Sequence, residues 1–431
     1  MNIGKSLTTA SLIISLTASF TQAQMTGSNQ RAEIIPRLFY EFNIDPNQPQ
    51  AIPTSTPTTT PQAHCGPHRP LSIAWNKNST LIAVGLGSGA GYSGCADSGA
   101  LQVFDMSSGY PRLLRNWHAT DKVTSVTFTP DGTQLIIGGL DDKVRVFELS
   151  PFDELQTLDE GGSDIKAVAI NSNGTLLAAG GDDTNVRLYL KNSTNHFNHV
   201  KTLSDAGGYV EDADFNPING QLAVGERRQS VRIYKGISPY DHLKTLPDSG
   251  GRISAVAYNP DGTLLASADD KREIRLYNGT NPDSPIQNFA VPEPISSMTF
   301  NREGTQFLVG FRSGRINIYK GTRLLTHQYS LPLVKQVAAI YALAYSPDGK
   351  WLLVGKGASI LIFSADGSRL PTAQASTTEA ITTAVNITEA STETSTETST
   401  ESGTEMDNSS TLTALSLVTL LTALLQEMIL Q

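Results

Sequence analysis

One strand–turn–strand pattern recurs seven times along this 431-residue chain, and the repetition limits the possible folds more than any other feature. Its clearest copy, residues 122–147, reads KVTSVTFTPDGTQLIIGGLDDKVRVF. Polar and apolar residues alternate over 123–128, a Pro-Asp-Gly turn follows, and the apolar run 135–137 leads through a second turn to a third strand at 144–147. Turns this short cannot carry a parallel crossover, so each copy predicts an antiparallel meander.

The spacing of the copies predicts how many strands each unit holds. The first strands are expected to end at residues that recur at intervals of 42 to 53 residues, namely Trp75, Phe128, Ile170, Phe215, Tyr258, Phe300 and Tyr345. Fourth strands are expected between the copies, at 113–117, 155–158, 200–203, 243–246, 286–289 and 327–331. Four strands in a repeat of this length are typical of one blade of a β-propeller.

The number of strands also predicts how the ring closes. Seven three-stranded copies are accompanied by only six fourth strands, and the sequence RLFYEF at 37–42 supplies the missing one. We therefore expect residues 38–42 to pair with 360–363 and to complete the last blade. The predicted fold is all-β, a seven-bladed β-propeller over 37–364 in which each blade buries its faces against its neighbours.

These repeats resemble the WD40 repeat family over residues 37–364. The resemblance rests on the Pro-Asp-Gly turn, on third strands such as VRVF, on His118 at the place of the family's turn histidine, and on an aspartate after the second strand (Asp141, Asp182, Asp269). No third strand ends in Trp-Asp and no Gly-His pair occurs, so the family's hydrogen-bonded tetrad of His, Ser or Thr, Asp and Trp is incomplete. The resemblance implies the propeller architecture.

Residues 1–23 are predicted to be a signal peptide. Lys5 precedes an apolar run that ends at Leu16, and Thr21-Gln22-Ala23 fits a cleavage site of small residues. The alternative is a buried N-terminal helix. We expect the chain to be exported into the secretory pathway.

Export allows the two cysteines to form a disulfide. Cys65 precedes the first strand of the first copy, and Cys95 lies in its long second loop, 85–99. Connections of these two kinds emerge on the same face of a propeller, which we call the top face, so we expect a Cys65–Cys95 bond worth about 3 kcal/mol. A metal site of Cys65, His64 and His68 is the alternative. The long connections 44–70 and 85–99 form either a binding surface on the top face or a flexible, O-glycosylated link.

Asn-x-Ser/Thr sequons agree with export. Four fall in turns between first and second strands or just after third strands, and these connections emerge opposite the cysteines, on what we call the bottom face. The predicted N-glycosylation sites there are Asn78, Asn173, Asn192 and Asn278, and two further sequons lie near the C-terminus, at Asn386 and Asn408. Glycans on the bottom face would leave the top face accessible.

The composition changes abruptly after the last copy. Residues 371–411 are rich in Ser, Thr and Glu and predict a disordered, O-glycosylated stalk. Residues 412–431 are apolar but short for a membrane span, which favours a glycosylphosphatidylinositol (GPI) attachment signal, with Ser402, Gly403 and Asn408 as candidate attachment positions. A retained membrane helix or a fully secreted protein are the alternatives.

The charge distribution argues against a nucleic-acid partner. The formal net charge is −9, and eight acidic residues without a single Lys or Arg lie between 371 and the C-terminus, which leaves −1 for the rest. A nearly neutral propeller lacks the basic surface that nucleic-acid binding needs.

The top face carries the residues most suited to binding or chemistry. Lys122, Asp164, Tyr209 and Arg252 precede first strands, and Asp212 and Asp214 replace the Ser, Thr or Ala of other copies. Asp212 and its neighbours suggest a calcium or lactone-hydrolase site, or simply a solvated channel rim. The row Arg145, Arg187, Arg232 and Arg275 predicts either a recognition stripe or packing between blades, the latter favoured because these positions repeat.

A propeller fixes no activity by itself, so function follows from the exposed face. We expect a monomeric, non-catalytic, cell-surface propeller without cofactor or metal, held on the outer face of the plasma membrane by a lipid anchor, that binds an extracellular protein or glycan. One alternative is a structural component of an extracellular matrix or coat, and another is a secreted propeller hydrolase resembling lactonases.

Overall fold

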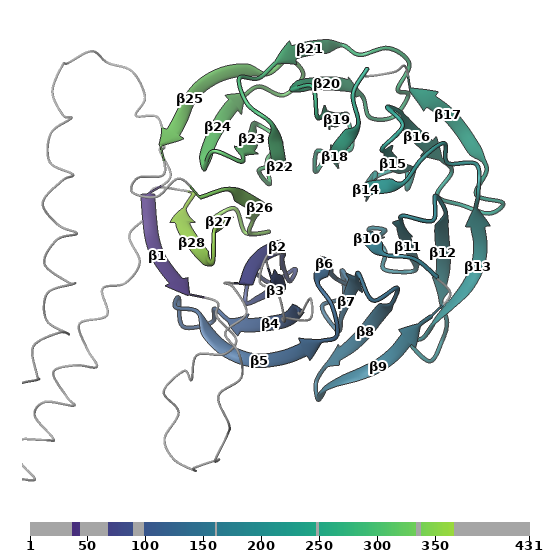
Figure 1. The fold of residues 1–431 in the computed structure, drawn as a ribbon, viewed down its shortest axis with the longest axis vertical. Coiled ribbons are helices and arrows are strands. Elements are labelled where there is room, and N and C mark those ends of the chain that lie inside the picture. The colour runs from purple at the N-terminus through teal and green to yellow at the C-terminus, as the bar shows by residue number, and fades with distance from the viewer. Residues whose placement is uncertain are drawn as a thin grey trace, which may run out of the picture. The chain divides into compact units, whose positions relative to one another are not determined.

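A computed structural model describes residues 37–43, 68–88, 99–159, 162–246, 250–332 and 338–365. Within these ranges every regular element is a strand, and the strands form seven four-stranded antiparallel sheets. The sheets stand as blades around a central axis (Figure 1). The all-β, seven-bladed propeller predicted from the repeats is therefore confirmed.

The blades follow the chain in order, and their strands have the following bounds. Blade 1 holds β2 (His68–Trp75), β3 (Leu81–Ser88), β4 (Gly99–Asp105) and β5 (Arg112–Ala119); blade 2 holds β6 (Val123–Phe128), β7 (Gln134–Gly139), β8 (Val144–Leu149) and β9 (Phe152–Leu158). Blade 3 holds β10 (Ile165–Ile170), β11 (Leu176–Gly181), β12 (Val186–Lys191) and β13 (Phe197–Leu203); blade 4 holds β14 (Val210–Phe215), β15 (Leu222–Glu226), β16 (Val231–Tyr234) and β17 (His242–Leu246). Blade 5 holds β18 (Ile253–Tyr258), β19 (Leu264–Asp269), β20 (Glu273–Asn278) and β21 (Gln287–Ala290); blade 6 holds β22 (Ile295–Phe300), β23 (Gln306–Phe311), β24 (Arg315–Lys320) and β25 (Thr326–Pro332). Blade 7 holds β26 (Ile340–Tyr345), β27 (Trp351–Lys356), β28 (Ser359–Ser364) and β1 (Arg37–Asn43).

The ring closes as predicted. Strand β1 pairs antiparallel with β28, so that Leu38 lies opposite Phe363 and Phe42 lies opposite Ile360. In Figure 1 the two strands lie side by side at the outer edge of blade 7. Strand β1 therefore covers the edge of β28 and is the fourth strand of blade 7. In every other blade the fourth strand directly follows the third strand in the sequence.

A buried polar residue follows the first strand of every blade and forms the turn to the second. In six blades its side-chain oxygen accepts the backbone N–H five residues further on, as in Asn171 with Leu176 (2.9 Å) and Ser346 with Trp351 (2.9 Å). Such side-chain bonds satisfy backbone groups that would otherwise be buried without partners. The exception is Asn216, whose side-chain oxygen accepts the backbone N–H groups of Ile218 and Asn219. The seven residues are Asn76, Thr129, Asn171, Asn216, Asn259, Asn301 and Ser346.

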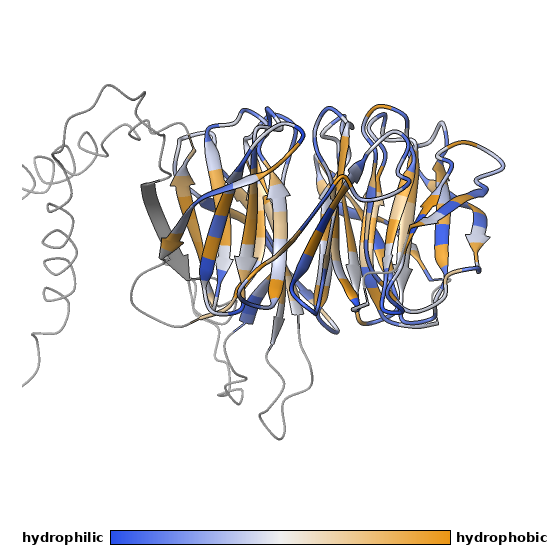
Figure 2. Ribbon diagram, turned by 90° about the horizontal axis from the view of Figure 1, so that it is seen from above, coloured by the Kyte–Doolittle hydropathy of each residue, from blue (hydrophilic) through white to orange (hydrophobic). Residues whose placement is uncertain are grey.

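The hydrophobic core lies between the blades. Seven clusters of buried side chains each combine residues of two neighbouring blades, for example Leu101 of blade 1 with Phe147 of blade 2. The edge-on view shows hydrophobic stretches within the strands and hydrophilic residues in many of the connections at both faces (Figure 2). Since both faces of each blade are covered in this way, no blade is complete without its neighbours.

Close approach of neighbouring blades explains the glycines near the end of the second strands. A Cβ atom on Gly225 would lie 2.6 Å from Cγ2 of Ile253 in the next blade, and one on Gly180 would lie 2.7 Å from Cγ1 of Val210. Side chains cannot approach this closely, so glycine at this position lets the first strand of one blade pack directly on the second strand of the previous one.

Several predicted features lie outside the described residues. They are the signal peptide 1–23, the long connections 44–67 and 89–98 with Cys65 and Cys95, the stalk 371–411 and the C-terminal segment 412–431. Among the described residues, no helix has the length and apolar character that crossing a membrane requires.

The closing strand makes the first testable prediction. Deleting residues 37–43 removes one strand from blade 7 and exposes the backbone edge of β28, so we expect the free energy of unfolding to fall by several kcal/mol and the protein to aggregate on heating. Thermal denaturation followed by circular dichroism would measure the change. A deletion of residues 24–36 is the control, and equal melting temperatures for the two deletions would contradict the closure described here.

Candidate functional site

The candidate binding residues lie together on one face. Lys122, Asp164, Tyr209 and Arg252 directly precede β6, β10, β14 and β18, the first strands of four consecutive blades. First strands all begin on the top face, so the structure places these four residues on the same face, over blades 2 to 5. Asp212 lies within β14, the first strand of blade 4.

The half of this face over blades 4 and 5 combines arginines with an aromatic ring. The guanidinium carbon of Arg227 lies 5.2 Å from the ring centre of Tyr209, which is 39% exposed. Glu211 lies between two arginines, with Oε1 2.8 Å from Nε of Arg227 and 4.0 Å from a terminal nitrogen of Arg252. Arg252 in turn donates its backbone N–H to Asp270 (2.9 Å). We call Tyr209, Glu211, Arg227 and Arg252 the top-face patch.

Arg227 was not among the residues that the sequence pattern predicted for the top face. It lies in the connection between β15 and β16, whereas Tyr209 precedes β14, and only the pairing of β14 with β15 brings the two together. The signal in the sequence was the Arg227-Arg228 pair, at the place where blade 3 carries Asp182-Asp183.

The half over blades 2 and 3 is acidic. Burial raises the pKa of Asp164, and the negative charges of Asp182, Asp142 and Asp121 raise it further. Lys166 offsets part of this charge by its ion pair with Asp182 at 2.5 Å. Within the described ranges, no three His, Cys, Asp or Glu side chains are grouped so that they could hold a metal ion.

Asp212 and Asp214 link blade 4 to blade 5. Oδ2 of Asp212 accepts the N–H of Val256 (2.9 Å), and Oδ2 of Asp214 accepts the N–H of Tyr258 (2.7 Å). Burial raises the pKa of both carboxyl groups to about 7.

Serines occupy the position of Asp212 in three other blades and make the same bond. Ser72 accepts from Val126 (3.1 Å), Ser125 from Val168 (3.1 Å) and Ser297 from Leu343 (3.1 Å). Asp212 therefore fills a recurrent structural position, in which its carboxylate joins neighbouring blades.

The repeated arginines are structural, as the packing interpretation predicted. Each lies on a third strand, Arg145 packs against Trp117 in the outer strand of the preceding blade, and Arg145, Arg187 and Arg275 are at most 9% exposed. Their ion pairs are Arg145–Asp141 (2.6 Å), Arg187–Asp183 (2.5 Å), Arg232–Glu226 (2.7 Å) and Arg275–Asp269 (2.9 Å). We call the space that each of these side chains occupies the arginine slot of its blade.

The four sequons of the described residues lie on the bottom face, in the connections predicted for them. Asn78, Asn173 and Asn278 are exposed and Asn192 is half-buried. In three of them the asparagine oxygen accepts the hydroxyl of the threonine two residues later, at 2.6 Å for Asn173 and 2.8 Å for both Asn192 and Asn278. Glycosylation at these sites stays a prediction. Cys65, Cys95, Asn386, Ser402, Gly403 and Asn408 lie outside the described residues.

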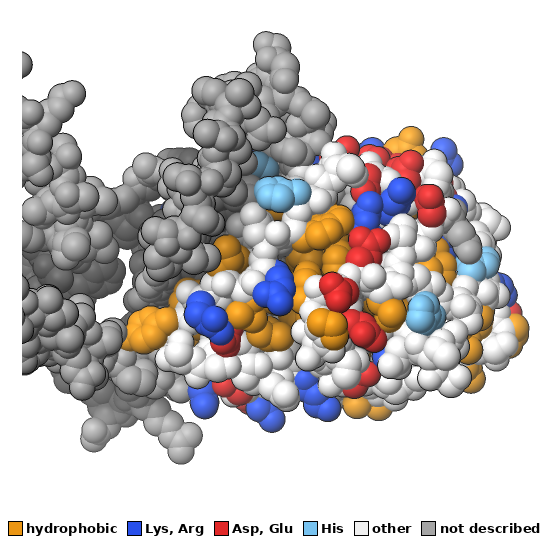
Figure 3. Space-filling model, turned by 90° about the horizontal axis from the view of Figure 1, so that it is seen from below, with side chains coloured by type: hydrophobic (Ala, Val, Ile, Leu, Met, Phe, Trp, Pro, Cys, Tyr) orange, Lys and Arg blue, Asp and Glu red, His pale blue; other side chains and the backbone are white. Residues whose placement is uncertain are grey.

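Charge on the wall of the ring is mixed. In the edge-on view of Figure 3, acidic and basic side chains lie close together among hydrophobic ones, and this side carries no extended basic area. The wall drawn there is therefore unlike the positively charged surface that binds nucleic acids.

Comparison with known proteins supports the repeat assignment. The family model "WD domain, G-beta repeat" matches residues 111–148, 152–189, 240–278 and 333–368. The first of these segments runs from β5 of blade 1 through the three inner strands of blade 2, so the sequence repeat is shifted by one strand from the blade.

The relatives share only part of their length with this chain. Protein HIRA of Dictyostelium discoideum is 24% identical over 139 residues, which is 27% of this chain and 12% of that protein. WD repeat-containing protein AAC3 of the same organism is 24% identical over 165 residues, 38% of this chain and 32% of that protein. A chain in the crystal structure of a mitotic checkpoint complex is similar with a TM-score of 0.58 and 18% identity, covering 73% of this chain and 99% of that one, which shows a shared fold.

The carboxyl groups between blades 4 and 5 make stability depend on pH. Their pKa values, raised from 3.8 to about 7, mean that the folded protein binds more protons than the unfolded chain between these values. Their contribution to stability is therefore full below about pH 4 and is lost as the pH rises to about 7. In Asp212→Asn the amide oxygen still accepts from Val256 without charge, so we expect the variant to be about 4 kcal/mol more stable at pH 8 and equal to the parent at pH 4.

Urea denaturation at pH 4, 6 and 8 would measure this difference. Ser125→Ala, at the equivalent position of blade 2, is the control, with an expected loss of about 1 kcal/mol that is the same at each pH. If the free energy of unfolding of Asp212→Asn, like that of Ser125→Ala, differed from the parent by the same amount at every pH, the proposed role of the carboxyl charge would be ruled out.

Proposed function

Because the chain is a seven-bladed propeller of WD40-like repeats, we propose that it is an exported, non-catalytic interaction module, tethered to the cell surface by a lipid anchor, whose top face binds an extracellular protein or glycan. The observation that carries this proposal is the opposite character of the two faces. The bottom face presents four sequons, and the top face presents the aromatic and charged side chains of blades 2 to 5.

The top-face patch has the composition of a protein-binding surface. Tyr and Arg are enriched among the residues that contribute most to binding energy, because a ring or guanidinium group offers a large contact area together with hydrogen bonds. Tyr209 and Arg227 already lie against each other, so little conformational freedom is lost when a partner covers them. The acidic residues over blades 2 and 3 give the face a charge asymmetry that would orient the partner.

Two features of the sequence support the proposed tether. A region of Ser, Thr and Glu over 371–411 lengthens the distance between propeller and membrane, and 412–431 has the apolar character of a GPI attachment signal. The third strand of the last blade runs from the top face to the bottom face, so the stalk would leave from the side that carries the sequons.

Enzymatic release tests the anchor. We expect a phosphatidylinositol-specific phospholipase to release the protein from intact cells into the medium, because the enzyme cuts the anchor between lipid and sugar. Immunoblotting of cells and medium measures the release. A variant with a known transmembrane helix in place of 412–431 is the control that stays with the cells, and retention of the natural chain after treatment would contradict the lipid anchor.

Site-specific photo-cross-linking tests the binding face. We expect a photoreactive phenylalanine analogue in place of Tyr209 to capture an extracellular partner on cells. The control places the same analogue at Ile237, which is 70% exposed in the connection between β16 and β17 on the bottom face. Capture from position 237 but not from position 209 would contradict the proposal, as would turnover of a lactone by the purified protein.

A further inference from the structure

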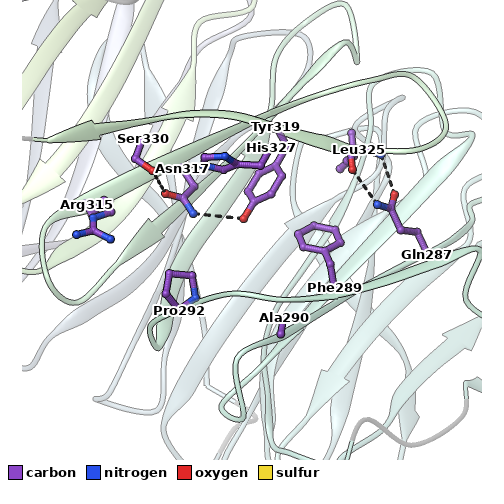
Figure 4. Close-up of a pocket in the computed structure, with 10 residues that line it drawn as sticks. All are labelled: Gln287, Phe289, Ala290, Pro292, Arg315, Asn317, Tyr319, Leu325, His327 and Ser330. Carbon is purple, nitrogen blue, oxygen red and sulfur yellow. Dashed lines mark hydrogen bonds between the residues drawn. The ribbon is translucent and has the colours of Figure 1, made fainter.

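The outer wall between blades 5 and 6 contains a cavity of 430 Å³ (Figure 4). It is lined by Phe289 of β21 and by Asn317, Tyr319, His327 and Ser330 of blade 6, and Arg315 lies at one end. Phe289 is half-buried, whereas Asn317 and Tyr319 are only 4% and 5% exposed. The cavity is thus a site on the ring's wall, separate from the top-face patch.

The register of the strands identifies this cavity as an arginine slot without its arginine. Asn317 pairs with Ser330 across β24 and β25, as Arg145 pairs with Thr157 across β8 and β9 in blade 2. Phe289 pairs with Ile274 in blade 5, as Trp117 pairs with Leu101 in blade 1. Asn317 and Phe289 therefore correspond to Arg145 and Trp117, and a shorter side chain leaves the space open.

Blade 2 shows what the complete slot contains. The guanidinium carbon of Arg145 lies 5.1 Å from the ring centre of Trp117, and that ring lies 5.3 Å from the ring of Phe147. At the junction of blades 5 and 6 the two rings are kept, as Phe289 of blade 5 and Tyr319 of blade 6 with centres 4.9 Å apart, and the position of the arginine holds Asn317. The outer strands of blades 2, 3 and 4 hold a leucine at the position of Phe289, paired in the same register (Leu158, Leu203 and Leu246), so a ring at this position is not a feature of every blade.

The arginine and its acid are absent together. The acids that hold the arginines lie four or six residues before them, and in blade 6 these positions hold Ser313 and the fully buried Phe311. The polar groups that remain are engaged with one another: Ser330 donates to Oδ1 of Asn317 (2.7 Å), and Asn317 donates to the hydroxyl of Tyr319 (3.3 Å). Arg315, at one end of the cavity, forms an ion pair with Glu293 at 3.3 Å.

We propose that the cavity between blades 5 and 6 binds an arginine side chain of a partner protein, which takes the place that Arg145 occupies in blade 2. The guest guanidinium lies against the ring of Phe289, an arrangement that attracts cations because the face of an aromatic ring is negative. Its charge is compensated by Glu293, the ion-pair partner of Arg315. The inference concerns the wall of the ring and does not depend on the proposed function of the top face.

Titration of the purified full chain with an acetylated, amidated Gly-Arg-Gly peptide tests the proposal, with the corresponding Lys and Glu peptides as comparisons. Isothermal calorimetry is expected to show saturable binding of the Arg peptide, weaker binding of the Lys peptide and none of the Glu peptide. Asn317→Arg supplies an internal arginine that fills the slot and should abolish binding. Phe289→Leu copies the residue of blades 2 to 4, removes only the ring and should weaken binding roughly tenfold.

Arg315→Ala separates a cationic guest from an anionic one. Removing this guanidinium frees Glu293 for the guest, so we expect the Arg peptide to bind several-fold more tightly. Thermal melting of each variant shows whether it is folded, and the Phe289→Leu and Arg315→Ala results decide the question if Asn317→Arg does not fold. Absence of saturable binding of the Arg peptide, a preference for the Glu peptide, or weaker binding of the Arg peptide to Arg315→Ala would each overturn the proposal.

Discussion

Burial of both faces of every sheet is the requirement on which this structure depends. A four-stranded sheet with apolar side chains on both faces cannot exist alone in water, and the ring solves this by placing each sheet between two others. Seven clusters of buried side chains result, one at each junction of neighbouring blades. The glycines opposite Ile253 and Val210, the serines between first strands and the buried arginines all serve this same contact, because they let neighbouring sheets approach closely while their polar groups stay paired.

Near-identical blades also make it possible to recognise where function departs from structure. Most positions repeat because every junction has the same geometry, so a residue that departs from its equivalents is a candidate for another role. Glu211, Arg227 and Tyr209 depart on the top face of blade 4, and Asn317 departs on the wall of blade 6. Asp212 departs in residue type only, since its carboxylate makes the bond that Ser125 makes in blade 2. Comparing the blades thus distinguishes a residue that keeps the bond between blades, such as Asp212, from residues that give one blade a surface the others lack.

Much of the fold could be predicted from the sequence, because alternation and turn residues are local signals. The closing strand is the clearest case: counting strands was sufficient to pair Leu38–Phe42 with Ile360–Phe363. The sites were harder to predict because they join segments that are distant in sequence. Tyr209 and Arg227 meet only through the β14–β15 pairing, and the cavity at Asn317 depends on the register of β20 with β21 and of β24 with β25. The row of arginines was visible in the sequence, but the consequence of its interruption at Asn317 was not.

Closure by β1 also has a consequence for how the protein is made. During translation β1 is synthesised first and β28 last, so β1 stays without its partner strand until the rest of the ring has been synthesised. Contacts between residues so far apart form slowly, and until then the growing chain has unpaired strand edges and an uncovered blade at its end. Premature termination anywhere before Ser359 would yield a chain without the partner of its own first strand. The pairing of β1 with β28, and with it the closed ring, is therefore available only to chains synthesised as far as β28.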